Sequence, residues 1–429
     1  MSVTMSNGWI RAGLVAVVLA GVGCQPQRPV EPSPPKETAK ASDDLPPALA
    51  GGKPMLMHYM PWYKTPEKRG AWGSHWTGHE KQHNPSVIGA DGLPDIWSHY
   101  HPLIGLYDST DADVLMCQLL QMKFAGVDGV IADWYGIAKE ADYPEVHEAT
   151  QALFAATKKA GMYFAACYED RSVQLLVDWG KLQPAETTNH LVDVFQWMQT
   201  YWFADAHYYR INERPLLLNF GPIYFQDAAA WSAAMAPLPV RPAYFALHHL
   251  WRKAGADGGF TWVHYDPWQG SPTPQTILNR IGEVYRYPSP NPNEVLVSAY
   301  PGFNDVYRER HPELPHRDGQ TLRETLSVAL AGAWPLVQLI TWNDYGEGTI
   351  IEPTHEFGYT FLEVIQQERR AEIGEKLTYT KDDLRLPAAW LALKKSGKHA
   401  NAKMDHIEQL LRLGYTGIAR TASASLESP

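Results

Sequence analysis

The sequence predicts an α/β protein: a (β/α)8 TIM barrel with a small helical C-terminal extension. Short apolar runs rich in β-branched and aromatic residues alternate with helical patterns from residue 54 to residue 371. We count eight such runs, as a barrel of parallel strands requires. A doubly wound open sheet is the alternative, but no Gly-rich dinucleotide-binding turn follows any run.

The N-terminus predicts export and a tether. Arg11 precedes an apolar run over 12–23 that is too short to span a bilayer. Small residues directly before Cys24 resemble a bacterial lipobox, so 1–24 is predicted to be a signal peptide that leaves a lipid on Cys24. Gly21 stands where a larger aliphatic residue is usual, and ordinary signal-peptide cleavage is the alternative. Residues 25–53 are rich in Pro, Glu, Lys, Ser and Ala and predict a flexible linker.

The predicted barrel domain covers 54–371. Its expected strands are 54–63, 129–134, 162–170, 215–220, 243–248, 260–265, 295–300 and 336–342. Its expected helices are 111–125, 143–160, 188–203, 227–235, 274–285, 321–331 and 359–371. Thr110 or Asp111 is the expected N-cap of the first helix, and Gly126 and Gly161 end the first two helices.

The predicted C-terminal extension covers 372–429. Two amphipathic stretches, 387–396 and 402–413, predict short helices on the outside or bottom of the barrel. Residues 416–429 have the composition of a frayed tail.

The composition restricts which classes of binding partner are expected. The formal net charge of -10 argues against nucleic acid and against anionic membrane surfaces, so membrane contact is expected only through the N-terminal anchor. The 16 Trp and 22 Tyr supply flat rings that pack cores and also stack on sugars. Cys117 and Cys167 fall in a helix and a strand, which predicts buried free thiols.

Polar residues gather where the predicted strands end. Because catalytic side chains collect at the C-terminal strand ends of such barrels, we take these residues as site candidates. They are His58, Tyr59, Trp62, Asp133, Trp134, Glu169, Asp170, Asn219, His248, His249, His264, Tyr265, Asp266, Tyr300, Asn304, Trp342, Asn343, Asp344 and Glu347.

Carboxylates, amides and aromatic rings without a Cys or Lys nucleophile point to sugar chemistry. Glycosidic cleavage needs one carboxylic acid to protonate the leaving oxygen and a second carboxylate as base or nucleophile. Asp344 and Glu347 follow the last strand and lie three residues apart. In a helical turn their Cβ atoms would be roughly 5–6 Å apart, whereas an extended segment would separate them. A purely structural role, with Asp344 capping the next turn, is the alternative.

The motif Trp342-Asn343-Asp344-Tyr345-Gly346-Glu347 resembles glycoside hydrolase family 71, the α-1,3-glucanases, and also family 99, the endo-α-mannosidases and mannanases. Family 99 carries Glu where this chain has Asp344. Residues 58–63, 73–76, 105–109 and 125–134 look more like family 99. The resemblance spans about 54–362.

This resemblance implies a barrel enzyme that cuts α-linked glucan or mannan oligo- or polysaccharides without metal or cofactor. Glu347 falls on the family acid position and Asp344 on the second carboxylate. Because Asp is one methylene shorter, retention and inversion both stay open. Substrate contacts are expected from Tyr59, Trp62, Trp76, Trp134, Glu169, His248, Tyr265, Tyr300, Trp342 and Asn343.

Two further functions compete with this hypothesis. A glycan-binding surface lipoprotein without catalysis would keep the barrel and the aromatic rings. A zinc hydrolase is suggested by His79-Glu80-Lys81-Gln82-His83, which matches H-E-x-x-H, but Gly78 before it and Asn84-Pro85 after it disfavour the required helix. Of the neighbours His248 and His249, at most one can enter the barrel mouth. Arg171 leaves Glu169 and Asp170 open to either a salt bridge or a binding role.

Overall fold

Eight parallel strands form a closed barrel in the computed structural model, which describes residues 51–307 and 313–427. The strands are β1 (Met55–Tyr59), β2 (Gly129–Trp134), β3 (Tyr163–Tyr168), β5 (Arg214–Asn219), β6 (Ala243–Leu247), β7 (Gly258–Phe260), β8 (Val295–Ala299) and β9 (Val337–Leu339). Their order is β3-β2-β1-β9-β8-β7-β6-β5, and pairing of β3 with β5 closes the ring. A two-residue strand, β4 (Arg210–Ile211), pairs antiparallel with β5. The predicted fold class is confirmed.

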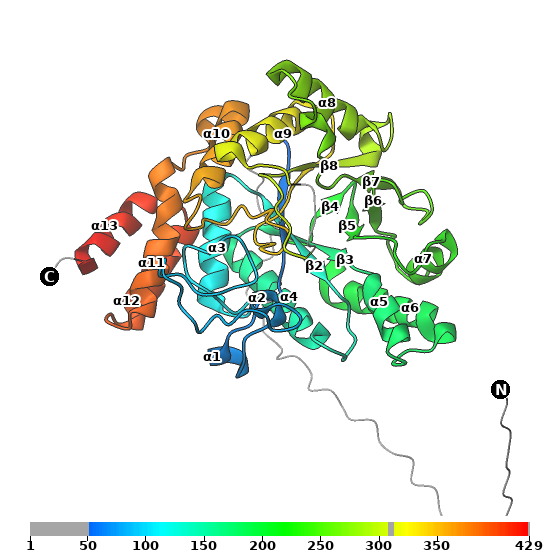
Figure 1. Ribbon diagram of the computed structural model, residues 1–429, viewed down its shortest axis with the longest axis horizontal. Helices are drawn as coiled ribbons and strands as arrows, with labels where there is room; N and C mark the ends of the chain where they lie inside the picture. Colours follow the sequence, from blue (N-terminus) through cyan, green and yellow to red (C-terminus); the bar gives the residue numbers. More distant parts are fainter. Residues whose placement is uncertain (1–50, 308–312, 428–429) are drawn as a thin grey trace, which may run out of the picture. The chain divides into compact units, whose positions relative to one another are not determined.

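Helices follow most strands and surround the barrel (Figure 1). The main ones are α3 (Ala112–Ala125), α4 (Tyr143–Ala160), α6 (Thr187–Met198), α7 (Ala228–Met235), α8 (Pro274–Arg286), α9 (Gln320–Ala331) and α10 (Thr360–Ile373). Shorter ones are α1 (Pro66–Arg69), α2 (Ser74–Thr77) and α5 (Arg171–Asp178). A π-helical turn, Gln199–Phe203, continues α6, and 3-10 turns occupy Pro184–Glu186, Asp266–Trp268, Pro292–Glu294, Arg317–Gly319, Gly374–Lys376 and Lys381–Arg385.

Local signals set the helix ends as the sequence predicts. The side chain of Asp111 accepts hydrogen bonds from the backbone N–H groups of Asp113 and Val114, which begins α3. Gly126 and Gly161 end α3 and α4 in the left-handed conformation, with φ of 90° and 65°. Glycine adopts this conformation without the steric cost that a Cβ would impose.

A buried ion pair fixes the bottom of the barrel, where the strands begin. Arg369 of α10 is 1% exposed and bonds to Asp128, to Glu372 and to the backbone oxygens of Gly126 and Lys53. Asp128 in turn accepts the N–H of Met55, the first residue of β1. Three chain segments therefore meet at one guanidinium: α10, residues 126–128 and residues 53–55.

The C-terminal extension packs outside the barrel. It contains α11 (Leu386–Lys395), α12 (Asn401–Arg412) and α13 (Thr416–Glu427), and α11 lies against α3 (Figure 1). The first two helices confirm the prediction, while the frayed tail expected from residue 416 onward is wrong up to residue 427. Met404, Ile407 and Leu411 of α12 and Ala419 of α13 are buried, which explains why this segment stays helical.

Three strands end at least three residues earlier than predicted. Strand β1 stops at Tyr59, β7 at Phe260 and β9 at Leu339, although all three runs continue with apolar residues. After β9 the peptide between Ile340 and Thr341 is cis, and the N–H groups of Ile340 and Trp342 still bond to the backbone oxygens of Ala299 and His58. The N–H of Thr341 then bonds to the oxygen of Thr349 within the following loop. The chain after β9 is thus committed to a compact turn.

Residues 1–50 lie outside the described part of the chain, and so do the predicted signal peptide, the lipid attachment at Cys24 and nearly all of the predicted linker. Within the described residues, no helix is both long and apolar enough to cross a bilayer. Cys117 and Cys167 are buried free cysteines, as predicted.

Candidate active site

The turn after β9 brings Asp344 and Glu347 together. The N–H of Gly348 bonds to the oxygen of Asp344 at 3.0 Å, which closes a single helix-like turn. One carboxylate oxygen of Asp344 accepts the N–H of Glu347 at 2.9 Å. Asp344 therefore caps the turn, as the structural alternative holds, and at the same time stands beside the other acid.

The two acids differ in exposure and in protonation. Asp344 is 4% exposed, and burial raises its pKa from 3.8 to about 7, with backbone N–H groups of Glu347 and Gly346 opposing the rise. Glu347 is half-buried, and burial together with the charge of Asp344 raises its pKa well above the usual range. Because the charge of one acid favours the proton on the other, Glu347 keeps its proton to higher pH than Asp344, which ionises around pH 7.

A second carboxyl pair lies near the first. Asp133 is the second-last residue of β2 and Glu169 directly follows β3, and the two side chains share a hydrogen bond. Burial and the charge of Glu169 raise the pKa of Asp133 well above its usual range. The pKa of Glu169 is also raised by burial, but the hydrogen bond from Asp133 and the charge of Arg171 oppose the rise. Asp133 is therefore the protonated donor of this pair.

The two pairs act on each other electrostatically. The charge of Glu169 contributes to the raised pKa of both Asp344 and Glu347, and so does the charge of Asp305, which follows β8. Five carboxyl groups from strands β2, β3, β8 and β9 thus converge at the C-terminal end of the barrel. The pKa values of Asp133, Glu169, Asp344 and Glu347 are all raised, and a cluster of acids with raised pKa values is typical of acid–base catalytic sites.

Trp262 holds Glu347 in place. Its indole N–H donates to a carboxylate oxygen of Glu347 at 3.2 Å. The ring is half-buried and packs edge-on against His58 (centroids 5.1 Å apart) and Phe220 (4.8 Å). This hydrogen bond favours the ionised form of Glu347 and so lowers its pKa, against the effect of burial.

The sequence does not single out Trp262 or Asp305, whereas Asp133 is among its strand-end site candidates. Trp262 lies two residues after Phe260. Because side chains alternate between the two faces of a strand, Trp262 lies on the same side as Phe260, and this alternation is the signal that points to it. The sequence predicts a substrate contact from Trp134, the neighbour of Asp133, and not from Asp133.

Six expected substrate contacts pack inside the protein instead, which corrects the prediction for them. Tyr59, Trp76, Trp134, Tyr300, Trp342 and Asn343 are each 0–1% exposed, so none offers a ring face or an amide to a sugar. The polar side-chain atoms of all six except Trp342 bond within the protein. Tyr59 donates to Gln118, and Trp76 donates to the oxygen of Tyr107. Trp134 points outward and donates to His147.

Asn343 shows this structural role most clearly. Its amide oxygen accepts the N–H of Met60 at 2.8 Å, and its amide nitrogen donates to the oxygen of Met60 and to the hydroxyl of Tyr107. The side chain mimics a strand partner for β1 just where the ladder ends. The Tyr300 hydroxyl is likewise bonded to the backbone of His264.

The other expected contacts remain at the surface of the mouth or near it. Glu169, His248 and Tyr265 are half-buried. His248 lies between His249 and His264, with ring centroids 4.8 and 4.9 Å away. His249 is the exposed one of the two neighbours.

Asp170, next to Glu169, is fully buried and accepts the backbone N–H groups of Ile223, Tyr224 and Phe225. This carboxylate therefore anchors the loop after β5, while Glu169 faces the other acids. The sequence left the roles of these two neighbours open.

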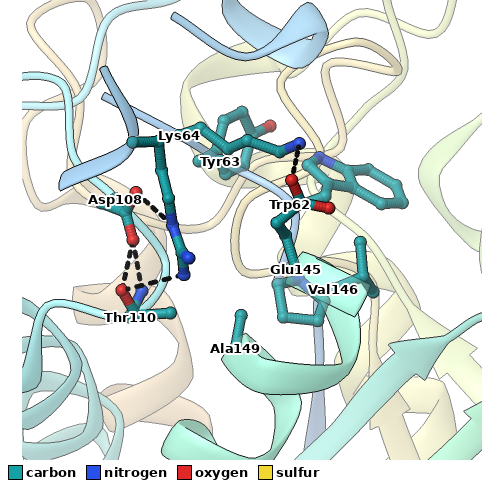
Figure 2. Close-up of a pocket in the computed structure, with 10 residues that line it drawn as sticks. Trp62, Tyr63, Lys64, Asp108, Thr110, Glu145, Val146 and Ala149 are labelled. Atoms are coloured by element: carbon teal, nitrogen blue, oxygen red, sulfur yellow. Dashed lines mark hydrogen bonds and ion pairs between the residues drawn. The ribbon is translucent and has the colours of Figure 1, made fainter. Parts of the chain in front are cut away.

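Trp62 is 7% exposed and stacks on His75, with centroids 4.2 Å apart. Figure 2 shows it beside a small hollow, where Lys64 pairs with Glu145 and Arg69 pairs with Asp108. None of the five converging carboxyl groups lines this hollow. It is separate from the candidate active site.

The H-E-x-x-H match does not form a zinc-binding helix. Helix α2 ends at Thr77, and Lys81 adopts a positive φ of 56° inside the motif. His83 pairs with Asp95 at 2.7 Å. Among residues 51–307 and 313–427, no three His, Cys, Asp or Glu side chains are grouped so as to hold a metal ion.

Comparison with known proteins finds matches in structure only. No family model matches the sequence, and no curated protein matches it. The barrel is similar to that of a family 99 glycoside hydrolase. The endo-alpha-mannosidase of Bacteroides thetaiotaomicron superimposes with a TM-score of 0.53 at 17% identity, over 74% of this chain and 98% of that one. Its complex with BIS-TRIS-propane gives 0.54 at 17% identity, over 74% and 97%. A glycoside hydrolase-like protein gives 0.52 at 11% identity, over 76% and 96%.

Proposed function

We propose that this chain is a glycoside hydrolase acting on an α-linked glucan or mannan, with Glu347 as general acid and Asp344 as its partner. The observation that carries the proposal is the pair of acids on one turn, one holding a proton and the other titrating near neutrality. General acid–base catalysis needs this division of roles. The likeness to the family 99 barrel supports the same reaction class.

The proposed reaction begins with proton transfer from Glu347 to the glycosidic oxygen, as the bond from that oxygen to the anomeric carbon breaks. Asp344, ionised, takes a proton from a water molecule or from the neighbouring sugar hydroxyl. Glu169, bonded to the protonated Asp133, offers its remaining oxygen lone pairs to sugar hydroxyl groups. Turnover should rise with pH as Asp344 ionises around pH 7, and it should fall when Glu347 loses its proton at higher pH.

The location is part of the proposal. The apolar run over 12–23 and the lipobox-like residues before Cys24 support an exported protein held at a membrane by a lipid, in the periplasm or on the cell surface. A soluble glycan or a neighbouring surface polysaccharide is the expected substrate in such a place.

Glu347→Gln tests the proposal. The amide keeps the shape of the side chain but has no acidic proton, so release of reducing ends from α-1,3-glucan and α-mannan oligosaccharides should fall roughly 100- to 10,000-fold. Glu356→Gln is the matched control, because Glu356 follows the same loop and pairs with His101 at the surface. Equal turnover of wild type and Glu347→Gln would remove Glu347 from the mechanism.

The same assay, run beside a binding measurement, separates the enzyme from a non-catalytic glycan-binding protein. Asp344 is short and almost fully buried, which is the observation that favours the binder. Glycan retained on the wild-type protein without new reducing ends would support binding alone. Where turnover occurs, the anomer of the first product, followed by NMR, decides between retention and inversion.

A further inference from the structure

Glu352 is a buried carboxylate that the proposed reaction does not use. It lies five residues after Glu347 and is 1% exposed. One of its oxygens accepts the hydroxyl groups of Tyr107 and Tyr345 at 2.8 and 2.9 Å. The other accepts the side-chain amide of Gln118 at 2.7 Å. Burial raises the pKa of Glu352 to about 7, and the side chains of Gln118, Tyr107 and Tyr345 oppose the rise by bonding to its carboxylate form.

These donors connect Glu352 to the turn that carries both candidate catalytic acids. Tyr345 stands between Asp344 and Glu347 in the chain, and its ring packs against Tyr63 and Trp76. The hydroxyl of Tyr345 donates to Glu352, so the carboxylate holds the turn through this side chain.

The same donors connect Glu352 to the end of β1. Tyr107 donates to Glu352 and accepts the amide of Asn343, whose oxygen holds the N–H of Met60. Gln118 donates to Glu352 while its oxygen accepts the hydroxyl of Tyr59 at 2.6 Å. Two chains of hydrogen bonds therefore lead from the end of β1 to the carboxylate of Glu352. One passes through Asn343 and Tyr107, and the other passes through Gln118.

The directions of the bonds from Gln118 and Tyr107 require an acceptor at position 352. The hydroxyl of Tyr59 occupies the oxygen of Gln118, so Gln118 presents its nitrogen to Glu352. Tyr107 already accepts from Asn343, so its own proton needs an acceptor. An amide at position 352 would place a donor against a donor in either orientation.

We infer that Glu352 is a positioning residue: as the common acceptor of Tyr107, Tyr345 and Gln118, it holds the Asp344–Glu347 turn in register with the end of β1. The expected effect of Glu352 on turnover rests on the proposed function, whereas its effect on the structure of the turn does not. Glu352 touches no substrate and acts through Tyr345 and Asn343. This role also explains the burial of Trp76 and Asn343, which belong to the support of the site.

Hydrogen exchange tests the inference without reference to activity. In Glu352→Gln, amides of the 340–353 segment should exchange at least tenfold faster than in wild type, while the barrel strands keep their rates. The matched control Glu356→Gln should leave the 340–353 segment unchanged. Wild-type rates in this segment, or equal acceleration across the barrel strands, would overturn the inference.

Turnover gives the second readout. A displaced turn should lower kcat roughly 10- to 100-fold and leave KM within about twofold, because misplaced catalytic groups cost rate more than binding. If the wild type turns over glycan and Glu352→Gln has the same kcat, the positioning role is refuted. If the wild type and Glu347→Gln prove equally inactive, the proposed function fails and the exchange rates alone decide the inference.

Tyr345→Phe covers the case in which Glu352→Gln fails to fold. It removes one hydroxyl, keeps the ring and spares the anion. Faster exchange confined to the 340–353 segment is again expected, smaller than in Glu352→Gln. Exchange at the wild-type rate in Tyr345→Phe would overturn the inference by itself.

Discussion

Replacing Asp344 by Asn should stabilise the protein while damaging the proposed activity. The carboxyl group is buried and its pKa rises from 3.8 to about 7 on folding. Between these two values the folded chain holds a proton that the unfolded chain has released. The contribution of Asp344 to stability is therefore fully present below pH 3.8, is lost as the pH rises to 7, and stays lost above.

The size of the effect follows from the shift. A difference of about three pKa units corresponds to about 4 kcal/mol. Asn keeps an oxygen for the N–H of Glu347 but introduces an amide nitrogen that must find acceptors, which costs about 1–3 kcal/mol. A net gain of roughly 2 kcal/mol at pH 8 remains, or roughly 2–3 °C in Tm for a folded body of this length.

Thermal unfolding of wild type and Asp344→Asn at pH 3.5, 5, 7 and 8 measures this gain. The difference in Tm should grow from pH 3.5 to pH 7 and then level off. Asp405→Asn, at an exposed site on α12, is the control and should show no such growth. A variant that is less stable than wild type at pH 8, or a gain of equal size at every pH, would refute the reasoning.

Two more predictions follow from other contacts. Trp262→Phe removes the hydrogen bond to Glu347 and keeps the ring, so the pKa of Glu347 should rise and the alkaline limb of the pH–rate profile should move to higher pH; a limb that moves to lower pH would contradict this. Arg369→Leu removes the guanidinium that faces the buried Asp128, and the free energy of unfolding should fall by roughly 3–5 kcal/mol in denaturant titrations. Lys381→Met, at an exposed ion pair with Glu363, should cost less than about 1 kcal/mol, and a similar cost for both variants would argue against a special role for Arg369.

The fold could be predicted from the sequence because each strand and helix carries its own local signal. Strand β2 and helix α4 have the predicted bounds, since Gly129, Pro144 and Gly161 mark their limits. Strand β7 was placed too late because its apolar run continues into Trp262, which leaves the ladder yet stays packed inside. Local periodicity does not report where a ladder ends.

The site could be predicted only in part. The Asp344–Glu347 pair is visible in the sequence because both acids follow one buried strand within a single turn. A period of two says that the neighbours Asp133 and Trp134 face opposite sides but not which side is inward, so the sequence does not reveal that Trp134 is fully buried. That assignment depends on the closed barrel, and so does the role of Asn343, which is bonded to a strand 283 positions away.

Lys53, the third described residue, is bonded to helix α10 at the base of the barrel. Its N–H bonds to Glu372 and its oxygen to Arg369, so the chain enters β1 at the base of the barrel. The converging carboxyl groups lie at the far end of the same strands. The first described residues therefore join the barrel at the end opposite these acids, and the segment that leads into β1 does not cross the mouth.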